Sequence, residues 1–217
     1  MNKYKICIGT IIFILFVLSS NKKNKFYKDI VKIDNPNKIN VLVNKNNILS
    51  ENYIPSDLEP IDIKYSYENK MLRKEAKEQF EKLSSDALSL GYRIVATSAY
   101  RSYDYQKDLY EFYVKEKGLE YADLCSARPG HSEHQTGLAV DVEGSNRSYD
   151  DFEDAIEFNW MKENAHKYGF ILRYPKDKQD ITGFKYEPWH YRYVGLNMAE
   201  EIYTKNLTLE EYIKEKR

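Results

Sequence analysis

The stretch SEHQTGLAVDV, residues 132–142, decides the fold, because it joins a polar turn to a short strand that contains a charged residue. Successive side chains of a strand point to opposite faces of the sheet. The larger apolar side chains of this strand share the face that packs into a core, while the small Gly137 and Ala139 share the other face with Asp141. A buried carboxylate is costly unless it is paired. Asp141 therefore requires a cation or strong hydrogen-bond donors beside it.

Helical and strand patterns alternate on both sides of this stretch. Apolar spacing predicts helices over residues 69–90, 103–117 and 152–168, each followed by a glycine. Alternating apolar residues predict strands over residues 39–43, 92–98, 137–142, 170–174 and about 185–193. Thr208 and Glu211 form a capping box that opens a terminal helix. The late strands are joined by connections too short for parallel crossovers, which favours an α+β fold with an antiparallel sheet.

The formal net charge of −1 hides an uneven distribution along the 217 residues. Residues 1–50 hold nine Lys and two Asp (9 − 2 = +7), which leaves 24 − 32 = −8 for residues 51–217. An acidic body with a basic leader argues against nucleic acid as the main ligand. Two cysteines are too few for a disulfide scaffold, and Cys125 is expected to be a buried thiol.

The first 20 residues have the form of a targeting segment. Lys3 and Lys5 precede an apolar run of 13 residues, 6–18, which fits a secretory signal and is shorter than the roughly 20 residues of a spanning helix. The lysines that follow at 22–25 also suit an uncleaved N-terminal membrane anchor. Residues 21–38, rich in Asn and Lys, are predicted to be a flexible tether. A single domain over residues 39–217 follows, and we expect it to be a monomer outside the cytoplasmic membrane.

Three residues of the body have the chemistry of a metal site. His134 lies just before the strand of Asp141, close enough in a turn to converge on the same point, and His190 lies in the later segment EPWHYRYVG. Two histidines and one carboxylate around an open fourth position describe a catalytic zinc site. The other histidines, His131 and His166, lack this register. We expect His131 to be a pocket or surface residue and His166 to be structural.

Four more residues are candidates for catalysis or substrate binding. Glu187 precedes His190 by three residues, and Pro188 between them favours a turned or extended segment. This spacing places Glu187 near the metal as a general base. Arg101, which follows a predicted strand, could stabilise an oxyanion. Gln106 and Ser132 could donate to the substrate, on weaker grounds.

These motifs resemble one family of bacterial cell-wall enzymes. The pattern Ser132-x-His134-x-x-Gly137-x-Ala139-x-Asp141, followed by Glu187-x-x-His190, is similar to that of the VanY-type D-alanyl-D-alanine carboxypeptidases, which are zinc peptidases and include L,D-carboxypeptidases. Further segments resemble the family over about residues 39–205, among them TSAYRSYDYQ (97–106) and GFILRYP (169–175).

The resemblance implies a fold and a site. The fold is the small α+β zinc-peptidase fold with a mostly antiparallel sheet, shared with D-Ala-D-Ala dipeptidases and the Hedgehog signalling domain. The implied zinc ligands are His134, Asp141 and His190, with Glu187 as the catalytic base. Arg101 is implied to polarise the scissile carbonyl. Gln106 and Ser132 match positions that contact the substrate.

The implied function is removal of the C-terminal D-alanine from peptidoglycan stem peptides, with D,D- and L,D-specificity both open. The E-x-x-H form that includes Glu187 favours a carboxypeptidase, because the related endopeptidases usually carry Asp there. An endopeptidase that cuts within the stem or cross-bridge, and a non-catalytic wall-binding module, are the alternatives.

Overall fold

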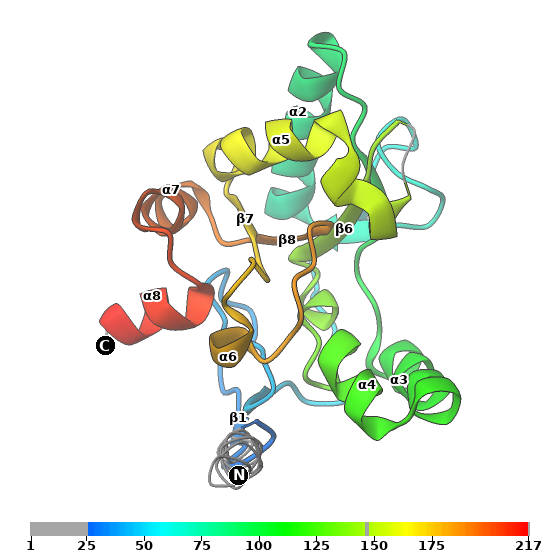
Figure 1. The fold of residues 1–217 in the computed structure, drawn as a ribbon, viewed down its shortest axis with the longest axis vertical. Coiled ribbons are helices and arrows are strands. Elements are labelled where there is room, and N and C mark those ends of the chain that lie inside the picture. The colour runs from blue at the N-terminus through cyan, green and yellow to red at the C-terminus, as the bar shows by residue number, and fades with distance from the viewer. Residues whose placement is uncertain (1–25, 146–147, 217) are drawn as a thin grey trace, which may run out of the picture.

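A four-stranded antiparallel sheet organises the fold (Figure 1). The structure is a computed structural model that describes residues 26–145 and 148–216. The sheet has the order β5–β6–β8–β7, formed by β5 (Val95–Ser98), β6 (Ala139–Glu143), β8 (His190–Tyr193) and β7 (Phe170–Leu172). The predicted α+β class with an antiparallel sheet is confirmed.

Two helices, α2 (Lys74–Ser89) and α5 (Ile156–Asn164), lie over one face of this sheet (Figure 1). Buried residues of α2 recur every three or four positions and pack with the apolar side chains of β6 and β8 into the main core. The helix predicted from residue 69 begins later, because Met71–Arg73 forms strand β4 paired with β3 (Leu58–Pro60). The predicted glycine stop holds: Gly91 follows the helix with φ +89°.

The opposite face of the sheet is flanked by α3 (Tyr103–Lys117) and α4 (Leu119–Cys125), which pack against each other, and by the short α6 (Gln179–Thr182) (Figure 1). The bounds of α3 are those predicted, with Gly118 as its C-cap, and the Ser102 side chain caps its start. The sequence patterns did not predict α4. Between these helices and the sheet lies the region that collects the candidate site residues.

The last part of the chain adds a second, smaller apolar cluster. It contains α7 (Leu196–Lys205), which was not predicted, and α8 (Leu209–Glu215), which opens on the predicted capping box. The helix predicted over residues 152–168 is wrong as a single element. The chain forms the 3₁₀ segment η2 (Tyr149–Asp154), then α5, then the 3₁₀ segment η3 (Ala165–Tyr168), which ends at Gly169 as expected. Ala155 interrupts the first two with an extended backbone, φ −79° and ψ 146°.

Residues 26–38, which precede the predicted start of the domain, already pack against it. Strand β1 (Val31–Lys32) pairs in parallel with β2 (Asn47–Ile48), and the ring of Tyr27 lies 3.9 Å from the guanidinium carbon of Arg128. Residues 26–38 of the predicted tether are therefore held by pairing and aromatic contacts that their Asn/Lys-rich composition did not indicate. The strand predicted at residues 39–43 is not formed, although Val41 and Val43 are buried.

Within residues 26–145 and 148–216, no helix combines the length and the apolar character needed to cross a bilayer. The predicted signal or anchor over residues 1–20 and the start of the tether at 21–25 lie outside the described residues.

Candidate metal centre

A row of three side chains crosses the centre of the sheet. The strand register pairs Ser98 with Asp141 and Asp141 with His190. Directly opposed residues of antiparallel strands project from the same face. This face is opposite to the one on which Val140 and Tyr191 enter the core. The sheet itself thus places His190 Nδ1 2.9 Å from Asp141 Oδ1.

His134 reaches the same row from the 3₁₀ turn η1 (Glu133–Thr136), which directly precedes β6. Gly137 ends this turn in the left-handed region, φ +66°, a conformation that glycine adopts without strain. His134 Nδ1 lies 2.6 Å from the carbonyl oxygen of Ala99, to which it donates. Its other nitrogen, Nε2, is thereby left to face Asp141 Oδ2 at 3.3 Å.

These three residues fit a zinc ion. One ligand atom from each of His134, Asp141 and His190 can be chosen so that all lie within 4.8 Å of one another, and all three residues are buried. His134 Nε2 is a buried atom without a hydrogen bond. Two imidazole nitrogens and one carboxylate oxygen form the donor set of catalytic zinc, with a fourth position left open.

The electrostatics of the cluster favour a cation. Burial and Arg101 lower the pKa of His134 to about 4. Although burial opposes it, the hydrogen bond to Asp141 and the nearby carboxylate of Glu133 raise the pKa of His190 to about 9. The two histidines hold the pKa of Asp141 well below its usual range against the effect of burial. The site therefore concentrates negative charge and draws positive charge onto one imidazole.

Glu187 lies beside the cluster at the other end of a tight turn. His190 N donates to Glu187 O at 3.2 Å, so that residues 187–190 form the turn that Pro188 favours. Glu187 is buried, 7% exposed as a residue, and its carboxylate Oε2 lies 4.0 Å from His190 Nδ1. Burial raises the pKa of Glu187 from 4.5 to about 7. A carboxylate of this pKa can accept and release a proton near neutral pH.

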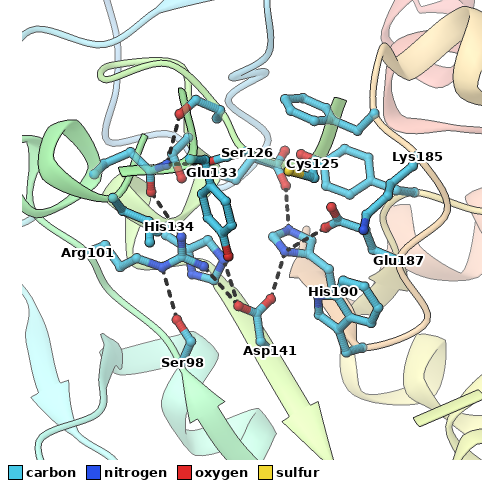
Figure 2. Close-up of a pocket in the computed structure, with 18 of the residues that line it drawn as sticks. Ser98, Arg101, Cys125, Ser126, Glu133, His134, Asp141, Lys185, Glu187 and His190 are labelled. Carbon is cyan, nitrogen blue, oxygen red and sulfur yellow. Dashed lines mark hydrogen bonds and ion pairs between the residues drawn. The ribbon is translucent and has the colours of Figure 1, made fainter. Parts of the chain in front are cut away.

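Arg101 is fixed by three hydrogen bonds. Its Nη2 donates to Asp141 Oδ2 at 2.9 Å, its Nη1 to Gln106 Oε1 at 3.0 Å and its Nε to Ser98 Oγ at 3.0 Å (Figure 2). Gln106 in turn donates to the carbonyl oxygen of Ala127 at 2.9 Å. The structure thus places Gln106, proposed from the sequence as a substrate contact, where it holds the guanidinium.

All of these side chains line one cavity of about 390 Å³, shown in Figure 2. Ser132, the other candidate substrate contact, also lines it. Cys125 is half-exposed and lines the cavity, so the expectation of a buried thiol is wrong. Sequence reasoning missed the rest of the wall, which includes Tyr105, Tyr113, Tyr121, Tyr174, Lys185 and Trp189. The helical spacing of the first two tyrosines on α3 was the available signal.

The remaining histidines lie elsewhere. His131 is buried, donates from Nδ1 to the carbonyl oxygen of Asn44 at 2.8 Å and packs edge-on against Tyr27. It lines a neighbouring cavity and is not a member of the metal cluster. His166 stacks on Tyr203 with ring centroids 3.7 Å apart, which agrees with the structural role expected for it.

The fold and the site together define a small α+β protein with a buried His/Asp/His centre and a glutamate beside it. The model of the VanY family, described as "D-alanyl-D-alanine carboxypeptidase", matches residues 69–196 of this chain. The chain belongs to this VanY family.

Individual relatives agree with this family. The bifunctional D-Ala-D-Ala dipeptidase and D-Ala-D-Ala carboxypeptidase VanXYC of Enterococcus gallinarum is 42% identical, over 79% of this chain and 91% of its own length. The structure of the LD-carboxypeptidase LdcB has 44% identity and a TM-score of 0.80, over 86% of this chain and 91% of that one. A variant of the D,D-pentapeptidase VanY in complex with Zn(II) has 34% identity and a TM-score of 0.69, over 80% and 98%.

Proposed function

We propose that this protein is a zinc-dependent carboxypeptidase that removes the C-terminal D-alanine from peptidoglycan stem peptides. The observation that carries the proposal is the convergence of His134, Asp141 and His190 with Glu187 and Arg101 in one cavity. Relatives of both D,D- and L,D-specificity support it. The proposal therefore covers the terminal D-alanine of a pentapeptide or a tetrapeptide stem.

The metal would be held by His134, Asp141 and His190. When bound, zinc acts as a Lewis acid and lowers the pKa of water, which supplies a nucleophile at neutral pH. The solved relative in complex with Zn(II) supports this choice of metal.

Glu187 and Arg101 carry the proposed proton transfer and charge stabilisation. Glu187 accepts a proton from the nucleophilic water and passes it to the nitrogen of the leaving D-alanine, for which its raised pKa suits it. The Arg101 guanidinium is held beside the centre by Ser98 and Gln106, so that it can stabilise negative charge on the scissile carbonyl oxygen.

The cavity also offers a cation for a free carboxyl terminus. Lys185 lines the wall two residues before Glu187, with its ammonium 5.7 Å from the ring centroid of Trp189. We assign the substrate's terminal carboxylate to this lysine, since a charged group in a partly closed cavity requires a partner of opposite charge. This feature favours a carboxypeptidase over an endopeptidase.

A product assay tests the reaction. The purified protein is incubated with tetrapeptide and pentapeptide stems and with the same peptides amidated at the C-terminus, and the products are identified by mass spectrometry. We expect loss of one D-alanine from the free acids, no cleavage of the amides, and loss of activity on chelation that added zinc restores. Equal cleavage of the amides, or a cut inside the stem, would identify an endopeptidase. Zinc binding without any cleavage would identify a wall-binding module.

We also propose that the protein acts outside the cytoplasmic membrane, as residues 1–20 have the form of a signal or anchor and peptidoglycan is assembled there. Expression of the full chain in a bacterial host, followed by protease treatment of intact protoplasts, tests this. Degradation of the domain supports the external location, and complete protection refutes it. Release of the domain into the medium would indicate cleavage of the leader.

A further inference from the structure

Glu133, between Ser132 and His134 in the sequence, has a fully buried carboxylate that the proposed reaction does not use. Its Oε1 accepts hydrogen bonds from Arg173 Nε at 2.8 Å and from Arg192 Nη1 at 2.7 Å. Its Oε2 accepts none and lies 3.5 Å from His190 Nε2, which is buried and also makes no hydrogen bond. One oxygen thus binds the arginines, and the other faces the imidazole.

The two arginines are fixed from other directions. Both nitrogens at the end of Arg173 donate to the carboxylate of Glu210 on α8, at 2.7 and 2.8 Å. Arg192 Nη2 donates to the carbonyl oxygens of Ile39 and Val41, at 2.9 and 2.8 Å. Neither arginine is exposed to solvent. Rotation of the Glu133 carboxylate would therefore leave the buried Arg192 without its carboxylate partner and Arg173 Nε without its acceptor, which is costly.

Glu133 lies beside Nε2, the nitrogen of His190 that faces away from Asp141. Figure 2 shows the imidazole of His190 between Asp141 on one side and Glu133 on the other. In a neutral imidazole one nitrogen carries the hydrogen and the other holds the lone pair. When Nδ1 binds the metal, the hydrogen of the neutral ring must lie on Nε2, and the carboxylate of Glu133 beside Nε2 favours it there. The carbonyl of Ala99 has the corresponding effect on His134 at the opposite nitrogen.

We infer that Glu133 is a positioning residue for the metal ligand His190, fixed in place by Arg173 and Arg192. This inference rests on the proposed zinc site. The simpler reading is that Glu133 only neutralises two buried arginines. That reading accounts for Oε1 but not for the approach of Oε2 to His190, and Arg173 already has a second counter-ion in Glu210. The network also connects helix α8 to the metal centre through one chain of charges, all of them buried except the partly exposed Glu210.

The test measures zinc affinity in Glu133→Gln and Glu133→Asp by competition with a chromophoric chelator at pH 7. The first variant removes the charge. The second keeps the charge for the arginines but shortens the side chain, so that it cannot reach both the arginines and His190. We expect both variants to bind zinc about 10- to 100-fold more weakly, the usual effect of losing such a partner. If Glu133→Gln does not fold by circular dichroism, Glu133→Asp carries the test.

Two further measurements separate positioning from stability. The ¹⁵N chemical shifts of the His190 ring in the zinc-loaded protein, where the imidazole is neutral, should report a protonated Nε2 beside a carboxylate in the wild type and a changed Nε2 shift in Glu133→Gln. The matched control is Glu157→Gln, which changes a buried glutamate that bonds Ser145, and it should bind zinc as the wild type does.

Each failure has its own signature. Wild-type zinc affinity in both Glu133 variants, with a lower unfolding midpoint, would show that Glu133 is only a counter-ion and would overturn the inference. If the wild type itself bound no zinc, the proposed function would fall first, and the inference with it.

Discussion

Replacing Glu187 by glutamine should remove most of the activity while stabilising the metal-free protein. Glutamine keeps the shape of the side chain but cannot accept a proton. Loss of a positioned base lowers the rate about 10²- to 10⁴-fold, which corresponds to about 2.7 to 5.4 kcal/mol at about 1.36 kcal/mol per tenfold. The rise of wild-type kcat/KM with pH, which reports loss of the Glu187 proton, should be absent from the variant. In the wild type the midpoint of this rise should lie at or below pH 7, because a bound dication opposes the effect of burial on the Glu187 pKa.

The stability change follows from the same burial. Because the pKa of Glu187 is raised from 4.5 to about 7, the folded protein binds more protons than the unfolded chain between these values. The free energy of unfolding therefore falls as the pH rises through this window. Full ionisation would cost roughly 3 kcal/mol at about 1.36 kcal/mol per pH unit. Glutamine avoids this cost, so the variant should be more stable than the wild type at pH 7 by about 1 to 3 kcal/mol, and by less at pH 5.

The assay measures D-alanine release, bound zinc, and urea unfolding of the metal-free proteins at pH 5 and pH 7. Glu157→Gln is the control, because the Glu157 side chain is also shielded from solvent but has a lowered pKa: burial is outweighed by hydrogen bonds, chiefly from Ser145. That change should lower stability and leave kcat/KM unaltered. If Glu187→Gln with bound zinc kept more than about a tenth of wild-type kcat/KM, another group would be the base. A loss of metal-free stability at pH 7 would refute the burial argument.

Three other changes have defined outcomes. Arg101→Lys keeps the charge but not the three hydrogen bonds, so kcat/KM should fall at least about tenfold; an unchanged kcat/KM in the peptide assay would exclude the oxyanion role. Gly169→Ala should cost about 2 to 4 kcal/mol in urea unfolding, because its backbone is left-handed and the new Cβ would meet the Tyr193 ring at 2.5 Å. Gly91 is also left-handed but faces open space, so Gly91→Ala should cost only about 1 to 2 kcal/mol. Equal losses of stability in the two variants would show that the Tyr193 ring moves away from the new Cβ of residue 169. Removal of zinc from a sample at about 100 times its Kd should lower the melting temperature by roughly 5 to 10 °C in calorimetry, and no shift would mean that the folded protein does not bind the ion.

The sequence predicted the elements whose burial pattern is local. The helix at 103–117 has the predicted bounds because a capping serine precedes it and a glycine follows it. The helix predicted over 152–168 failed because Phe152 and Glu157 are both buried, although five residues of helix would turn them toward different sides. An interruption at Ala155 satisfies both. The local sequence pattern does not show this interruption, because it follows from the burial of Phe152 and Glu157 against different parts of the fold.

The segment 39–43 failed for a different reason. Its alternating apolar residues have the pattern of a strand, and Val41 and Val43 are indeed buried. A strand also needs a partner for its backbone, but the carbonyl oxygens of Ile39 and Val41 accept hydrogen bonds from the Arg192 side chain. A side chain about 150 residues away in sequence thus occupies the positions at which a neighbouring strand would pair, and apolar periodicity does not report it.

The same argument that found Asp141 would have found Glu133. Asp141 was singled out because a charge inside an apolar strand requires a partner. Arg192, in the strand HYRY, and Arg173, at the end of FILR, make the same demand with the opposite sign, and both are unexposed. The strand register puts Arg192 opposite Ala139, whose small side chain leaves space on the face that holds Asp141. The nearest acidic residue before the strand that contains Ala139 is Glu133. Charges of both signs on one sheet face therefore predict a buried network, and here the network contacts a metal ligand.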